Sequence, residues 1–144
     1  ENITYDILQQ LDGKYNITVA LGSSPVHKDM IIDYAEGKNI KVIVDADNIA
    51  ELMFEADLAI GAGGSTSWER CCLGLPTLLY ITAENQRMVA ENLEKKSAVV
   101  MVKNLKDDLK MIINNLAFWK AISKQSQLVC DGRGVKKVQE FLIK

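Results

Sequence analysis

Short runs of apolar residues alternate along the chain with segments in which apolar residues recur at helical spacing. Five of these runs are typical of buried parallel strands, which are continuously apolar rather than alternating. The expected strands cover residues 17–21, 40–44, 58–60, 77–81 and 98–102. Small or polar residues follow four of them, at the places where loops are expected to leave a sheet.

Helical periodicity fills the intervals between the runs. Ile49, Leu52, Met53 and Ala56 recur at i, i+3, i+4 and i+7, which places them on one helical face. A longer stripe covers residues 105–116, and shorter ones cover 3–11, 30–35, 88–93 and 135–142. Strand–helix alternation of this kind predicts right-handed βαβ units around a mainly parallel sheet. The expected fold class is therefore α/β, a Rossmann-like three-layer α/β/α arrangement.

Length and composition predict one globular domain, residues 1–144, with 48% apolar and 25% charged residues. A net charge of −2 offers no basic surface for nucleic acid. No apolar run approaches the roughly 18 residues of a membrane span. The three cysteines lack disulfide-framework spacing, which is typical of a reduced, cytoplasmic protein. The single histidine, His27, excludes a multi-histidine metal site.

The chain opens on a helical segment with no strand before it. A parallel sheet that begins with its crossover helix indicates that a strand precedes residue 1. We therefore expect this chain to be one half of a larger protein.

The glycine-rich segment 61–69 is the strongest candidate for a binding site. It joins an expected strand to an expected helix, where glycines let backbone N–H groups approach an anion and the helix dipole favours negative charge. In parallel sheets, ligands bind outside the carboxyl ends of the strands. The loops expected at those ends cover residues 22–25, 45–47, 61–65 and 82–86. Turn chemistry alone would also explain any one of them.

Familiar motifs fit this segment incompletely. A P-loop requires a lysine that is absent, and a nucleophile elbow requires a final glycine that Ser67 replaces. A dinucleotide fingerprint requires a third glycine where Thr66 stands, although Glu84 follows the next strand at about the position of a ribose-binding acid. Asp45, Asp47 and Glu84 lie on separate loops and make no carboxylate cluster for Mg²⁺.

Local structure offers a second interpretation of several candidates. Residues 66–69 fit a capping box in which Glu69 reaches back to the Thr66 N–H. Trp68 and the two adjacent cysteines would pack the helix. Asn85 and Gln86 would begin the next helix, His27 would be solvated or cap one, and residues 131–134 would form a turn before the last helix.

Residues 56–76, which read ADLAIGAGGSTSWERCCLGLP, resemble the C-terminal half of the UDP-sugar hydrolases of the pseudaminic-acid pathway. That family is also known as spore-coat polysaccharide biosynthesis proteins. The resemblance covers nearly the whole chain and includes residues 21–24, 44–53, 84–86 and 131–134. It implies half of a GT-B fold, in which two Rossmann-like domains face a cleft and the C-terminal one binds UDP.

The resemblance also implies roles for individual residues. Glu69 would hold the ribose hydroxyls, and the uracil would meet backbone groups near Ala46. The remaining substrate contacts would come from Gly63, Gly64, Ser65 and Thr66 for the diphosphate, and from Asn85 and Gln86 for the sugar.

The hydrolases of this family release UDP from UDP-2,4-diacetamido-2,4,6-trideoxy-β-L-altropyranose. Their general base is a histidine of the N-terminal half, so the resemblance implies no catalytic residue in this chain, and His27 does not replace the missing base. No metal or cofactor is expected, because backbone donors and the helix dipole can neutralise the diphosphate. UDP or the UDP-sugar would be the ligand and an N-terminal domain the partner. Two alternatives stay open: a GT-B UDP-sugar glycosyltransferase, and a non-catalytic nucleotide-binding module of a fusion protein.

Overall fold

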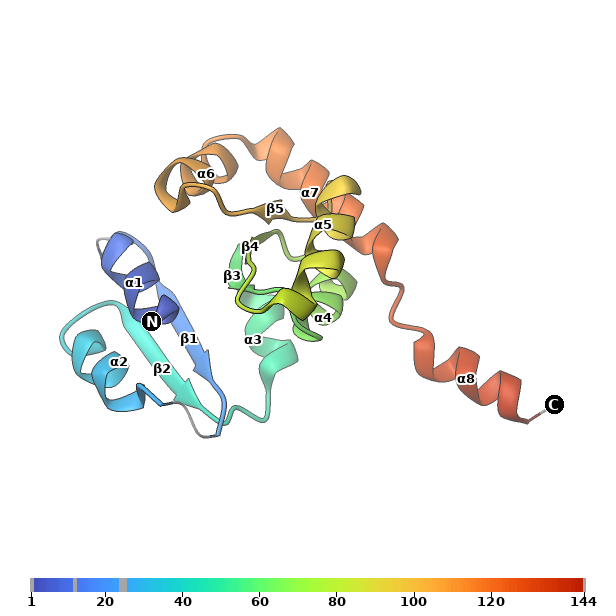
Figure 1. Cartoon of the computed structure of the whole chain (residues 1–144), viewed down its shortest axis with the longest axis horizontal. Coiled ribbons are helices and arrows are strands. Elements are labelled where there is room, and N and C mark those ends of the chain that lie inside the picture. Colours follow the sequence, from blue (N-terminus) through green and yellow to red (C-terminus); the bar gives the residue numbers. More distant parts are fainter. Residues whose placement is uncertain (1, 12, 24–25, 144) are drawn as a thin grey trace. The chain divides into compact units, whose positions relative to one another are not determined.

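The computed structural model describes residues 2–11, 13–23 and 26–143, and the chain divides into two compact units, Glu1–Leu52 and Met53–Lys144. The expectation of one domain over residues 1–144 stays a prediction. Helices and strands alternate along the chain, as Figure 1 shows, and each strand pair is parallel. The expected α/β class is confirmed.

The first unit holds one pair of parallel strands. Its elements are α1 (Ile3–Gln10), β1 (Ile17–Leu21), α2 (Lys28–Ala35) and β2 (Ile40–Val44). The strands pair in register from Ile17 with Ile40 to Leu21 with Val44. Leu8, Val19 and Ile31 are its buried core and come from α1, β1 and α2. Both strands have the bounds that their apolar runs predicted.

The helix α3 (Ile49–Glu55) crosses the boundary between the units, and the second unit follows it. Its elements are β3 (Ala59–Ala62), α4 (Thr66–Leu73), β4 (Thr77–Tyr80), the 3-10 turn η1 (Glu84–Gln86), α5 (Arg87–Lys95), β5 (Val100–Met101), α6 (Leu105–Ile113), α7 (Leu116–Val129) and α8 (Gly134–Leu142). The strands lie in the order β3-β4-β5. The strands expected from the sequence thus form two hydrogen-bonded parallel sheets, one in each unit.

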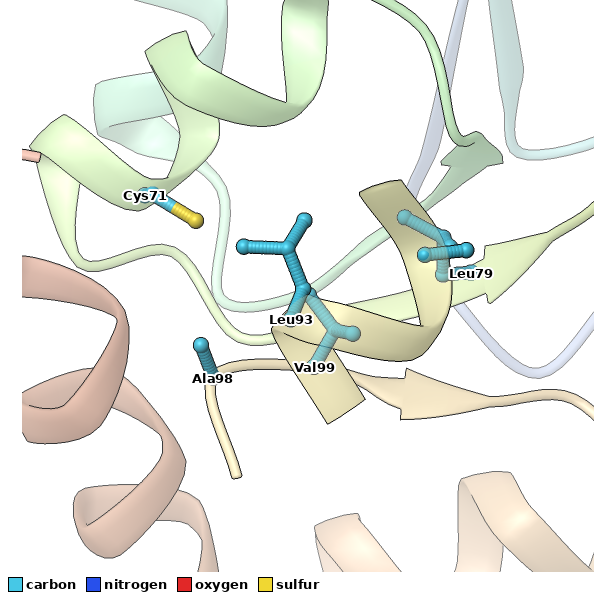
Figure 2. Packing of buried hydrophobic residues seen from close by; sticks show 6 residues of the cluster. Cys71, Leu79, Leu93, Ala98 and Val99 are labelled. Atoms are coloured by element: carbon cyan, nitrogen blue, oxygen red, sulfur yellow. The ribbon is translucent and has the colours of Figure 1, made fainter. Parts of the chain in front are cut away.

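A buried cluster packs one face of the second sheet. Cys71 of α4, Leu79 of β4 and Leu93 of α5 meet Ala98 and Val99, which precede β5, and Figure 2 shows these side chains together. Leu79 and Leu93 are each 1% exposed.

The segment 105–116 is not one helix, which corrects the sequence prediction. The helix α6 ends at Ile113, and α7 begins at Leu116 and runs to Val129, a helix that apolar spacing did not predict. The break is explained by capping, since the Asn115 side chain accepts a hydrogen bond of 3.0 Å from the Phe118 N–H. Leu116 is therefore on the first turn of α7, where it is exposed.

The turn expected before the last helix is present. Gly132 has a φ of 66°, and the Asp131 side chain accepts hydrogen bonds from the Arg133 N–H and from the Lys137 ammonium. Among the residues that the structure describes, no helix is long and apolar enough to cross a bilayer.

Candidate functional site

The junction of β3 and α4 presents three unpaired backbone donors. The first bonds of the helix run from the Ser67 N–H to the Gly64 carbonyl and from the Trp68 N–H to the Ser65 carbonyl, both 3.0 Å long. Within the described parts of the chain, the N–H groups of Gly64, Ser65 and Thr66 have no acceptor. Orphan donors at a helix N-terminus, together with the helix dipole, are suited to an anion.

Gly63 has a different part in this junction from the other loop residues. Its N–H donates to the Tyr80 carbonyl across the sheet, over 3.1 Å, and is not free for a ligand. A Cβ atom at this position would lie 3.4 Å from the Gln86 Cβ and from the Leu79 Cδ2. Gly63 therefore lets the loop pack closely against β4 and the start of α5, and this packing brings residues 63 and 86 together.

The Gln86 side chain is held in one orientation. Its Oε1 accepts hydrogen bonds from the Thr82 N–H and the Thr82 hydroxyl, over 3.1 and 3.0 Å. The amide NH₂ is therefore the group that remains for a ligand, and it can only donate. Asn85 lies exposed in the η1 turn before α5, so the local interpretation of this pair as a helix start is also correct.

Glu84 is engaged by a neighbour. Its two carboxylate oxygens accept hydrogen bonds of 2.8 and 3.1 Å from the Arg87 guanidinium. This contact holds the pKa of the exposed Glu84 carboxyl below its usual value. Arg87 thereby fixes the orientation of an exposed carboxylate.

Glu69 is exposed on the first turn of α4, and the capping box expected for it does not form. The N-cap residue is Ser65, whose side chain makes no capping bond, and in the described part of the structure no hydrogen bond joins Glu69 to the Thr66 N–H. The carboxylate is thus left available. Of the residues expected to pack the helix, Cys71 is buried, whereas Trp68 is 43% exposed and Cys72 is exposed.

Arg70 is a site residue that the sequence reasoning missed. Its side chain is only 6% exposed, and its Nη2 donates to the Ala62 carbonyl over 2.7 Å and to the Ser67 hydroxyl over 3.0 Å. Burial lowers the pKa of its guanidinium. The available signal was its spacing, because Ser67 and Arg70 are three residues apart and both lie on the buried face of α4.

Ala46 belongs to the first unit, in the loop that follows β2. It is half-buried, and the preceding residue, Asp45, has a φ of 53°, in the left-handed region. The Asp45 N–H donates to the Leu21 carbonyl over 2.9 Å. Of the other expected loop, residues 22–25, positions 24 and 25 lie outside the described residues, and the exposed His27 is the N-cap residue of α2.

Comparison with known proteins adds a family match and two relatives. The family model described as "Glycosyltransferase family 28 C-terminal domain" matches residues 4–127, a span that includes the glycine loop and η1. The spore coat polysaccharide biosynthesis protein SpsG of Bacillus subtilis is 26% identical over an alignment of 136 residues, and the match covers 88% of this chain and 40% of SpsG.

The second relative is an uncharacterized protein of Methanocaldococcus jannaschii. It is 32% identical over an alignment of 113 residues, and the match covers 74% of this chain and 23% of that protein. The chain therefore spans less than half the length of each curated relative.

Proposed function

We propose that this chain, which belongs to the glycosyltransferase family 28 C-terminal domain family, binds the nucleoside diphosphate of a sugar nucleotide where β3 meets α4. The observation that carries the proposal is the set of unpaired N–H groups of Gly64, Ser65 and Thr66 at the start of an eight-residue helix. These donors and the helix dipole would neutralise phosphate charge without a metal ion.

The neighbouring side chains complete the proposed assignment. Glu69 would accept hydrogen bonds from the ribose hydroxyls, because its exposed carboxylate has no capping role. The Gln86 amide, fixed by Thr82, would donate to the sugar, and Asn85 lies one residue before it. The uracil contact near Ala46 rests on the resemblance alone.

For the reaction, we propose that the parent protein hydrolyses a UDP-sugar, with UDP-2,4-diacetamido-2,4,6-trideoxy-β-L-altropyranose as substrate. The resemblance of residues 56–76 supports this. The relative named for spore coat polysaccharide biosynthesis supports a role in polysaccharide biosynthesis. When the bond between the sugar and the β-phosphate breaks, negative charge develops on the departing UDP. The N–H groups would stabilise that charge from positions set before the reaction, while a base on an N-terminal domain activates water.

A glycosyltransferase of the same architecture is the second candidate, because the matching family is named for that activity. Both reactions release UDP, so the site described here serves either. They differ in the group that attacks the sugar, which is water in one and an acceptor hydroxyl in the other. Product analysis with the parent protein distinguishes them: free sugar indicates the hydrolase, and a glycosylated acceptor indicates the transferase.

UDP is expected to bind the chain about tenfold more tightly than UMP. The β-phosphate adds charge where the loop offers three amide donors, whereas uridine and its α-phosphate are common to both ligands. Isothermal titration calorimetry at one ionic strength measures the two dissociation constants. Uridine serves as the control for contacts outside the loop, and equal affinities for UDP and UMP would contradict the diphosphate assignment.

The chain by itself is expected to bind the UDP-sugar without releasing UDP. No catalytic residue is assigned to it, and its single histidine, His27, is the exposed N-cap residue of α2. Chromatographic detection of UDP after incubation with the substrate checks this. Release of UDP that disappears in His27→Asn would instead identify His27 as the base.

A further inference from the structure

Arg70 carries a buried charge that takes part in no ion pair among the described residues. Burial lowers the pKa of the guanidinium, and the neighbouring Glu69 carboxylate raises this pKa by less. The ion pairs of the described residues are Glu84–Arg87, Lys136–Glu140 and Asp131–Lys137, and none of them includes Arg70. Its Nε is buried and has no hydrogen-bond partner. Removing a cation from water is costly unless it is paired, so this arrangement needs an explanation.

The guanidinium is held directly against the glycine loop. It donates to the Ala62 carbonyl before the loop and to the Ser67 hydroxyl after it, and the free N–H groups of residues 64–66 lie between these two contacts in the chain. Gly61, in β3, lies directly beside the guanidinium: a Cβ atom at this position would lie 2.1 Å from the Arg70 Nη1. The absence of a side chain at Gly61 is thus what makes room for the guanidinium.

We propose that Arg70 is a positioning residue for the diphosphate: its positive charge, enclosed by the turn that presents the three N–H groups, strengthens anion binding without touching the ligand. This rests on the binding site proposed above. In the free protein, the guanidinium and the positive end of the α4 dipole are neighbouring charges of one sign. A bound anion adds negative charge beside both.

A purely structural role is the competing explanation. The two hydrogen bonds of Arg70 tie the end of β3 to the first turn of α4, and that tether requires the forked donor geometry of arginine rather than its charge. The two roles differ in what lysine and methionine do at this position. Lysine keeps the charge and loses the fork, whereas methionine keeps much of the volume and loses both.

The experiment compares the whole chain with Arg70→Met, Arg70→Lys and Arg133→Met by calorimetry. The last variant removes an exposed arginine and is a control for the change in net charge. The probes are UDP, inorganic pyrophosphate and uridine. Arg70→Met is expected to weaken the binding of UDP and of pyrophosphate about tenfold, since a nearby charge acts over several ångströms. The affinity for uridine should stay unchanged. The UDP dissociation constant of Arg70→Lys should lie within about threefold of the wild-type value, and that of Arg133→Met should equal the wild-type value.

Two results would overturn the inference. One is an Arg70→Met variant whose UDP-to-uridine affinity ratio equals that of the wild-type chain. The other is an Arg70→Lys variant that loses as much UDP binding as Arg70→Met. Failure of both variants to fold would count in the same way, because the charge alone would then be insufficient.

Failure of the proposed nucleotide site looks different. If the wild-type chain binds pyrophosphate in an Arg70-dependent manner but does not bind UDP, the nucleotide assignment is wrong and the role of Arg70 stands. If the wild-type chain binds neither probe, both are wrong.

Discussion

Glu69→Ala is expected to raise the dissociation constant of UDP about 30-fold, which corresponds to roughly 2 kcal/mol. The exposed Glu69 carboxylate lies one turn into α4, close in sequence to the proposed phosphate donors, and can accept hydrogen bonds from both ribose hydroxyls. Hydrogen bonds to an ionised acceptor are stronger than neutral ones. Calorimetry with UDP and 2′,3′-dideoxy-UDP measures the effect, and the variant should lose the preference between them.

The stability of Glu69→Ala separates this role from capping. We expect its free energy of unfolding to stay within about 0.5 kcal/mol of the wild-type value, as for an exposed substitution. Glu140→Ala, which removes an exposed carboxylate from α8, is the matched control for both measurements. A loss of about 1 kcal/mol in stability with unchanged UDP binding would show that Glu69 acts as a helix cap after all.

Leu79→Ala is expected to lower the free energy of unfolding by about 3 kcal/mol. Leu79 is 1% exposed in the middle strand of the second sheet and packs with Cys71 and Leu93, as Figure 2 shows. Truncation removes apolar contacts and leaves a cavity that a strand paired on both sides closes poorly. Urea denaturation followed by tryptophan fluorescence reports on this unit, because Trp68 and Trp119 both lie in it.

The matched control for this variant is Leu128→Ala. Leu128 is 72% exposed on α7, so the same chemical change should cost less than about 0.5 kcal/mol. Equal losses in the two variants would contradict the assignment of Leu79 to the core. Since the Leu79 Cδ2 would lie 3.4 Å from a Cβ at Gly63, Leu79→Ala should also weaken UDP binding, whereas Leu128→Ala should not.

The strands could be predicted well because their signal is local. The runs at 17–21 and 40–44 are the strands β1 and β2 without change, since a buried parallel strand is apolar over its own length. The helix prediction over 105–116 was wrong because apolar spacing continues across Asn114 and Asn115, where capping ends one helix and starts another. For the same reason, the sequence prediction did not include the helix α7.

The glycine loop of the candidate site could also be predicted because its signal is local. A glycine run between an apolar strand and a helix indicates an anion-binding loop from sequence alone, and the loop lies where a strand and helix meet. Which of its amides are free does not follow from the sequence. The Gly63 N–H donates to the carbonyl of Tyr80, 17 positions later in the chain, and such a partner is found only when the strands are paired.

The sequence by itself determined the α/β class, the positions of most strands and the glycine loop, because each depends on residues that are neighbours in the chain. Only the tertiary structure decided that the Gly63 N–H is used by Tyr80, that Gly63 packs against the Leu79 side chain, and that Arg70 is buried behind the loop. Burial and hydrogen-bond partners depend on which distant segments pack together, and no local pattern of residues specifies them.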